Sequence, residues 1–174
     1  TGNTDVYVKC PENIMYFDTK TSVSKDIIEN DIKTAWKKNL ELLNVASKKG
    51  LCERFDSTIG ANTVLMPFGG KNQLTPPESM VAKVPVLNAE TTTVTMMSYG
   101  YHSDIAKLSP FHGAVYAVVE SLSKIVATGG NYKNVRLTFQ EYFEKLGSDK
   151  EKWGKPFAAL IGALLAQIET GTAA

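Results

Sequence analysis

The stretch that most constrains the fold is residues 54–85, RFDSTIGANTVLMPFGGKNQLTPPESMVAKVP. Three places where a backbone turns easily follow one another in it: Gly60, the pair Gly69-Gly70, and the turn at residues 75–77. Glycine adopts φ values that other residues avoid, and it lets a backbone approach a neighbour closely. The stretch therefore predicts a strand, a turn of the size that holds a phosphate, and a second strand.

Two short apolar runs, residues 63–66 and 80–86, lie on either side of the glycine pair, and Lys71 follows that pair directly. Backbone N–H groups of such a turn can hold a phosphate, with the lysine as a point charge. Gly69, Gly70 and Lys71 are therefore candidate nucleotide-binding residues. Because the spacing GxxxxGK[ST] of a P-loop is missing, a tight turn with a solvated lysine explains the same residues. Both interpretations stay open.

The composition is that of an ordinary globular domain with one core: 174 residues, 43% hydrophobic and 21% charged. A net charge of +1 gives no electrostatic reason to expect nucleic acid or an anionic membrane as a partner. No apolar run approaches the roughly 20 residues of a membrane span, and no signal peptide is recognisable. We therefore expect a cytoplasmic protein. Cys10 and Cys52 either form a disulfide or remain thiols, and a reducing cytosol favours thiols.

Hydrophobic periodicity predicts three long helices. The first covers residues 26–48 and ends at Gly50, a suitable residue beyond a helix C-terminus. The second begins at Ser109, with a proline at its first position, and ends at residues 129–130. The third begins near Ser148 and is interrupted at Pro156. Its expected buried face is Phe157, Leu160, Ile161, Leu164 and Ile168.

The second helix is expected to bury Val115, Val118, Val119, Leu122, Ile125 and Val126. Strands are predicted at residues 5–9, 63–67, 80–87, 92–99 and 135–139, and a short helix is expected to end near residue 146. This order of elements predicts an α+β fold, a mixed sheet with helices packed on one face.

Four stretches resemble one family. They are LNVASKKGLCERFD, FDSTIGANTVLMPFGGKNQLTPPESMVAK, SPFHGAVYAVVESLSKIVATGG and LTFQEYFEKLGSDKEKWGKPFAALIGALLAQ, and together they extend from residue 43 to near the C-terminus. The family is the large single-chain form of phosphoribosylformylglycinamidine synthase. The resemblance implies a truncated N-terminal domain of the aminoimidazole ribonucleotide synthetase-like type at residues 51–174. Residues 1–50 would form a connector with one long helix.

The resemblance implies that the chain is part of an ATP-dependent C–N ligase of purine synthesis. Such an enzyme uses glutamine as the amide donor and Mg²⁺ with ATP. Such a ligase converts formylglycinamide ribonucleotide to formylglycinamidine ribonucleotide. ATP activates the amide oxygen as an iminophosphate, and ammonia displaces the phosphate. The glutaminase and the rest of the synthetase are not represented, so we expect an excised piece that is inactive alone. The alternative is a non-catalytic structural module with a vestigial nucleotide site.

The partners implied are the remaining domains of the same polypeptide. A sheet that normally completes a neighbouring domain leaves an edge or an apolar face uncovered when it is cut out. We therefore expect the piece to self-associate through its sheet.

Glu120 is the candidate metal ligand. In ATP-binding members of the family the helix beginning at Ser109 resembles Glu-x-x-x-Asn, whose two side chains hold Mg²⁺, and an Asp after the Thr-Pro turn completes the set. Here Lys124 stands where the Asn belongs, and Ser79 stands about where the Asp belongs. A lysine has only donors and cannot bind Mg²⁺. Either Lys124 replaces the cation and contacts phosphate, or the pair is structural and the site vestigial.

The remaining polar candidates have structural explanations beside the functional ones. Asp56, Ser57 and Thr58 precede a glycine, where they contact a phosphate or metal or else cap a turn. His102 and His112 are the only histidines, and their surroundings do not resemble a zinc site. We expect His112, in the first turn of a helix, to be neutral and packed or hydrogen-bonded.

Overall fold

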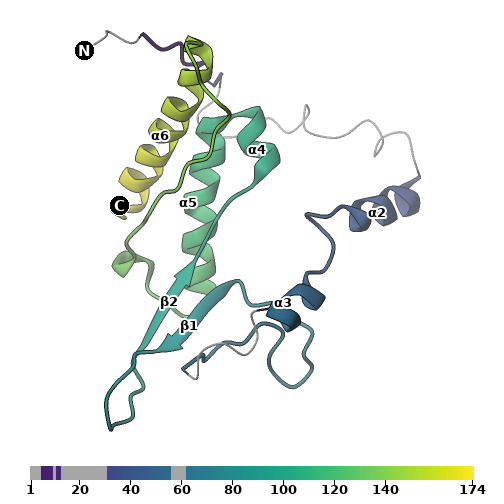
Figure 1. Ribbon diagram of the computed structural model, residues 1–174, viewed down its shortest axis with the longest axis vertical. Helices are drawn as coiled ribbons and strands as arrows, with labels where there is room; N and C mark the ends of the chain where they lie inside the picture. The colour runs from purple at the N-terminus through teal and green to yellow at the C-terminus, as the bar shows by residue number, and fades with distance from the viewer. Residues whose placement is uncertain (1–4, 10, 13–30, 56–61) are drawn as a thin grey trace. The chain divides into compact units, whose positions relative to one another are not determined.

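The computed structural model describes residues 5–9, 11–12, 31–55 and 62–174 (Figure 1). The chain divides into two compact units. One unit is Val23–Met97, and the other combines Thr1–Ser22 with Ser98–Ala174. The boundary expected at residue 50 falls inside a helix, Lys49–Phe55.

In its described residues, the first unit, Val23–Met97, contains two short helices and most of a two-stranded antiparallel sheet. The helices are α2 (Ile32–Glu41) and α3 (Lys49–Phe55), and the strands are β1 (Ser79–Lys83) and β2 (Val94–Ser98). The protein is therefore α+β, as expected. The expected mixed sheet is wrong for the described residues, because the strand predicted at 63–67 makes only one isolated bridge, from Thr63 to Ala82.

The single helix predicted over residues 26–48 is also wrong in its described part. Helix α2 starts after Asp31, whose side chain accepts a hydrogen bond from the backbone N–H of Thr34 at 3.1 Å. It ends at the C-cap Leu42, and Gly50 lies within α3 instead of terminating a helix. Ala35 is the one buried residue of α2, so little packing stabilises a longer helix.

The second unit contains α4 (Ser103–Leu108), α5 (Pro110–Ala127), the 3₁₀ turn η2 (Tyr132–Asn134) and α6 (Lys150–Thr170). The predicted ends of α5 are confirmed. The Ser109 side chain accepts from the backbone N–H of His112, and proline occupies the first turn. At the other end Gly129 has φ of 96°, and the Gly130 N–H donates to the carbonyl of Ile125 at 2.9 Å. The Gly129 N–H donates to the carbonyl of Val126 at 2.9 Å, and the two bonds form the Schellman motif that favours glycine beyond a helix.

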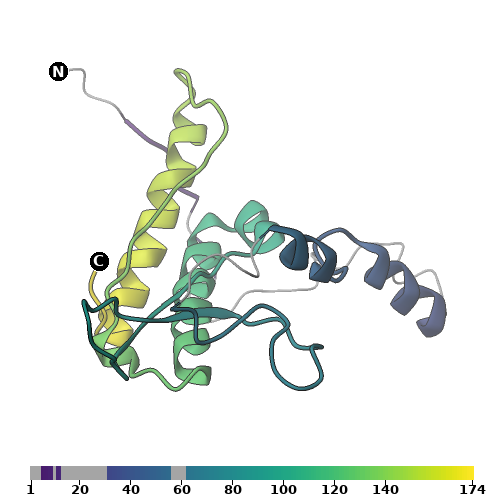
Figure 2. The ribbon, with the colours of Figure 1, turned by 60° about the horizontal axis from the view of Figure 1, so that its bottom comes forward.

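Helices α5 and α6 pack side by side (Figures 1 and 2). The approach is close because α6 presents small buried residues at every fourth position: Ala158, Gly162 and Ala166; one turn earlier, Gly154 lies against the backbone of Tyr7. A Cβ placed on Gly162 would lie 2.1 Å from the carbonyl oxygen of Phe111. Ala166 joins Val118 and Leu122 in the core, and Val115, Val135 and Leu137 pack against them.

The face of α6 predicted to be buried is therefore wrong, since its five large apolar side chains are 39–66% exposed. On α5 the prediction holds for Val118, Leu122 and Ile125, whereas Val119 and Val126 are exposed. A backbone-to-backbone approach leaves room only for small side chains, and this excludes the large ones from the α5–α6 contact.

The start of α6 and the effect of its proline also differ from expectation. The N-cap is Asp149, whose Oδ1 accepts from the backbone N–H groups of Glu151 and Lys152. The helix continues through Pro156 without a break. A proline removes one backbone donor, and the buried small-residue face supplies packing on both sides of it.

Residues 135–149 form neither the predicted strand nor the predicted short helix. A single parallel bridge joins Arg136 to Ala173, with the Leu137 N–H donating to the Ala173 carbonyl at 2.9 Å. Residues 5–9 are not a strand either. They lie against the start of α6, where the Tyr7 N–H donates to the carbonyl of Lys150 at 3.2 Å.

Candidate functional site

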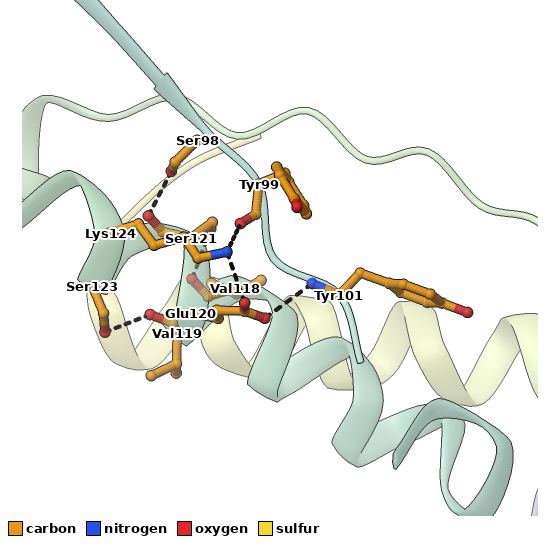
Figure 3. Close-up of polar contacts among 9 residues, drawn as sticks. All are labelled: Ser98, Tyr99, Tyr101, Val118, Val119, Glu120, Ser121, Ser123 and Lys124. Atoms are coloured by element: carbon orange, nitrogen blue, oxygen red, sulfur yellow. Dashed lines mark hydrogen bonds and ion pairs between the residues drawn. The ribbon is translucent and has the colours of Figure 1, made fainter. Parts of the chain in front are cut away.

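Glu120 and Lys124 of α5 contact each other and the segment that follows β2 (Figure 3). The Lys124 Nζ lies 2.8 Å from the Glu120 Oε1. It also donates to the carbonyl of Tyr99 at 3.1 Å and lies 4.4 Å from the centre of the Tyr99 ring. The other carboxylate oxygen, Oε2, accepts from the backbone N–H of Tyr101 at 3.0 Å. The pair therefore ties α5 to the segment that leaves β2.

The Lys124 side chain is only 13% exposed, and that of Glu120 is 39% exposed. Salt and water screen such a pair less than a surface pair, and the ring face adds a cation–π contact. One Glu120 oxygen lies against the Lys124 ammonium and the other accepts from the Tyr101 N–H, and an ammonium offers a metal ion no acceptor. These residues as arranged do not fit a Mg²⁺ ion at Glu120.

The geometry depends on a glycine between the two tyrosines. A Cβ on Gly100 would lie 2.0 Å from the carbonyl oxygen of Ala117, so only glycine lets this segment lie directly on α5. Ser98 adds a bond from its Oγ to the Ser121 carbonyl at 2.7 Å. Sequence reasoning did not single out these residues. The signal available was a glycine between aromatic residues at the end of a strand rich in β-branched side chains.

Residues 69–71 form an exposed turn in the other unit. The Gly69 N–H donates to the Met66 carbonyl at 2.9 Å, and Gly70 has φ of 78°. Lys71 is exposed. The geometry is that of a tight turn whose glycine at positive φ presents backbone to solvent.

Lys49 of α3 supports this turn, and the sequence analysis did not identify that role. Its Nζ donates to the Gln73 carbonyl at 3.0 Å, pairs with Glu53 at 3.6 Å and lies 5.8 Å from the centre of the Phe68 ring. Phe68 is buried with φ of 52°, a conformation that a bulky residue rarely adopts. The turn is thus fixed by its neighbours as well as by its glycines.

The predicted site residues belong to two units. The structure brings Glu120 and Lys124 together in one unit, and it has residues 69–71 and Ser79 in the other. Ser79 is buried at the start of β1. The predictions for residues 56–58 and for Cys10 lie outside the described residues, and Cys52 is a half-buried free thiol.

Both histidines contribute to helix starts. The His102 Nδ1 accepts from the Ile105 N–H at 3.5 Å and caps α4. His112 is buried, with its Nδ1 2.8 Å from the Ser109 Oγ and its ring edge-on to Phe111. Among the residues that the structure describes, no three His, Cys, Asp or Glu side chains are grouped to hold a metal ion.

Glu144 carries the clearest electrostatic perturbation in the second unit. The hydrogen bond and the charge of Lys155, followed by the charge of Lys152, lower the pKa of Glu144 below its ordinary value. Lys155 pairs directly with Glu144, and the Lys152 Nζ lies 3.6 Å from its Oε2. Lys152 and Lys155 therefore connect Glu144, in the segment 135–149, to α6.

A hollow of about 400 Å³ lies beside the C-terminal half of α5. None of its lining residues is a predicted site residue; they are Val119, Leu122, Ser123, Val126, Ala127, Tyr132 and Thr170. The wall is mostly apolar and has no charged group with which to hold a phosphate.

No protein-family model matches the chain, and no solved structure matches it. Within the described ranges, neither α5 nor α6, the two longest helices, is long and apolar enough to cross a membrane.

Proposed function

We propose that this chain is a structural segment of an ATP-dependent C–N ligase of the phosphoribosylformylglycinamidine synthase kind, with an N-terminal domain of the aminoimidazole ribonucleotide synthetase-like type. Two things support the proposal: the resemblance from residue 43 onward and the α+β character of the chain. The observation that carries its structural half is the position of the Lys124 ammonium, 2.8 Å from the Glu120 carboxylate. A cytoplasmic location is part of the same proposal.

In this proposal the Glu120–Lys124 pair joins α5 to residues 99–101 of the same unit instead of binding a cation. The Glu120 carboxylate accepts from the Lys124 ammonium and from the backbone N–H of Tyr101. The ammonium also donates to the Tyr99 carbonyl, so these bonds hold residues 99–101 against α5. The remaining domains of the polypeptide would bind ATP, Mg²⁺ and the ribonucleotide. The segment alone forms no amidine, and amidine formation by the purified chain would overturn that statement.

A second candidate function is phosphate contact by residues 69–71. Gly70 at positive φ and the exposed Lys71 favour it, because the turn presents backbone and a cation to solvent. Lys49 contacts Gln73 and Phe68 on either side of the turn, and order of this kind before a ligand binds lowers the entropic cost of binding.

The test is thermal unfolding of the purified chain with ADP, with and without Mg²⁺. A ligand that binds only the folded state at 100 times its Kd stabilises it by about 2.7 kcal/mol. We expect no Mg²⁺-dependent shift in the wild type or in Glu120→Gln. A Mg²⁺-dependent shift that Glu120→Gln abolishes would refute the structural role of the pair. A Mg²⁺-independent shift lost in Lys71→Ala but kept in Lys83→Ala, an exposed lysine of β1, would support phosphate contact at the turn.

A further inference from the structure

The middle of α6 has no polar side chain on any face. Residues 156–166 read PFAALIGALLA. The small residues face α5, and the large ones form what we call the outer α6 stripe. Its members and their exposed fractions are Trp153 42%, Phe157 46%, Leu160 55%, Ile161 39%, Leu164 54% and Ile168 66%.

A helix that packs on one side only normally carries polar side chains on its other side. A helix that is apolar all round is buried all round. Taking about 200 Å² for a large apolar side chain, the exposed fractions of the outer α6 stripe leave roughly 600 Å² per chain. That is as large as the largest apolar patch of a typical monomer, about 300–600 Å².

Four of the six members of the stripe have the same spacing in both directions along the helix, and Trp153 and Leu160 lie outside this symmetric set. Phe157, Ile161, Leu164 and Ile168 are separated by four, three and four positions. A two-fold axis between Ile161 and Leu164 therefore pairs these two residues across an antiparallel contact, and it pairs Phe157 with Ile168. Self-complementarity of this kind is what a two-fold interface requires.

The helix dipole favours the same orientation. The side-chain charges do not decide it, because the lysines of the first turns are offset by Asp149 and Glu151 and by ion pairs with Asp5 and Glu144. The helix dipole adds positive charge at the first end and negative charge at the second. Antiparallel packing sets opposite ends of the two dipoles beside each other, and parallel packing sets like ends together.

We propose that the outer α6 stripe is a docking surface for a second copy of this chain, which packs antiparallel to α6 about a two-fold axis. Two stripes together offer about 1,200 Å² of buried surface, the lower end of the range for specific interfaces. The association is therefore concentration-dependent. The inference stands independently of the ligase proposal, and it uses a different surface from the sheet.

Sedimentation over a range of concentrations tests the surface. The wild type should approach twice its mass of 19.0 kDa, and Leu164→Glu should remain monomeric because it places a charge at the centre of the stripe. The matched control is Leu87→Glu, at a loop position 95% exposed outside α6, which should dimerise like the wild type. A wild type that is monomeric at every concentration overturns the proposal. A dimer that Leu164→Glu leaves intact overturns it too, and points to the sheet.

Cysteine cross-linking tests the orientation, in a background with Cys10→Ser and Cys52→Ser. Phe157→Cys with Ile168→Cys should give an intermolecular disulfide, because the dyad brings position 157 of one chain to position 168 of the other. Within one helix the Cα atoms of positions 157 and 168 are about 16 Å apart. In the antiparallel dimer the Cα atoms of position 157 in the two chains are also about 16 Å apart. A disulfide needs Cα atoms within about 7 Å, so Phe157→Cys alone should stay uncross-linked. Cross-linking by that single variant would show parallel packing and refute the two-fold arrangement.

Discussion

The substitution Gly162→Ala tests how closely α5 and α6 pack. The added Cβ would lie 2.1 Å from the carbonyl oxygen of Phe111 and 2.9 Å from its carbonyl carbon. Favourable contact between such atoms needs about 3.5 Å, so the two backbones must separate by on the order of 1 Å. Separation would loosen the contact of Ala166 with Val118 and Leu122, which lies on the same helix pair.

The expected change combines two opposing effects. Alanine is favoured over glycine within a helix by about 1 kcal/mol, which stabilises the variant. Overpacking a dense contact typically costs about 1–3 kcal/mol, and a clash with backbone atoms lies at the upper end because they cannot rotate away. We expect Gly162→Ala to lower the free energy of unfolding by about 1–2 kcal/mol.

Urea unfolding followed by circular dichroism gives the two quantities needed, the midpoint and the slope. The control is Gly50→Ala in α3, where no atom lies within 4 Å of an added Cβ. There only helix propensity acts, and a gain of about 0.5–1 kcal/mol is expected. If Gly162→Ala stabilised the protein as Gly50→Ala does, the close α5–α6 contact described here would be wrong.

Two further predictions concern charged groups. Lys124→Met should lower the free energy of unfolding by about 1–2 kcal/mol, because it leaves the half-buried Glu120 carboxylate without its ammonium donor; Lys155→Met, at an exposed pair, should cost clearly less in the same urea experiment. The folded-state pKa of Glu144 is lowered, so its contribution to stability is present above the ordinary glutamate pKa and is lost as the pH falls through the folded-state pKa. Urea midpoints measured across acidic pH should therefore fall more steeply for the wild type than for Glu144→Gln, and equal slopes would contradict the ion-pair assignment.

Local signals in the sequence predicted the ends of α5. A serine followed by proline starts the helix, and two glycines end it, because capping depends on backbone groups only a few residues away. The strands around residues 80 and 95 were found for a similar reason, since each carries its own β-forming residues and turns. Asp149 was missed by one position as an N-cap because Ser148 offers the same chemistry.

Strand pairing was not predictable in the same way. Residues 135–139 alternate like a strand, yet the described structure gives them one bridge to Ala173 in place of a ladder. Pairing depends on a partner far away in the sequence, and alternation alone does not supply one. For the same reason Tyr99 and Tyr101 could be assigned to the candidate site only from the tertiary structure. Their backbone groups bond to Lys124 and Glu120 because Gly100 lets the segment lie directly on α5.

By itself, the sequence determined that an apolar helix follows Pro156, and it placed Glu120 and Lys124 one turn apart on another helix. The tertiary structure alone decided which face of α6 is buried. Periodicity identifies a buried face by its contrast with a polar one, and residues 156–166 offer no such contrast. The distance between the two helices decides the buried face. The backbone of α6 lies so close to Phe111 that position 162 has room only for glycine, and Leu164 and Ile168 therefore lie on the outer face.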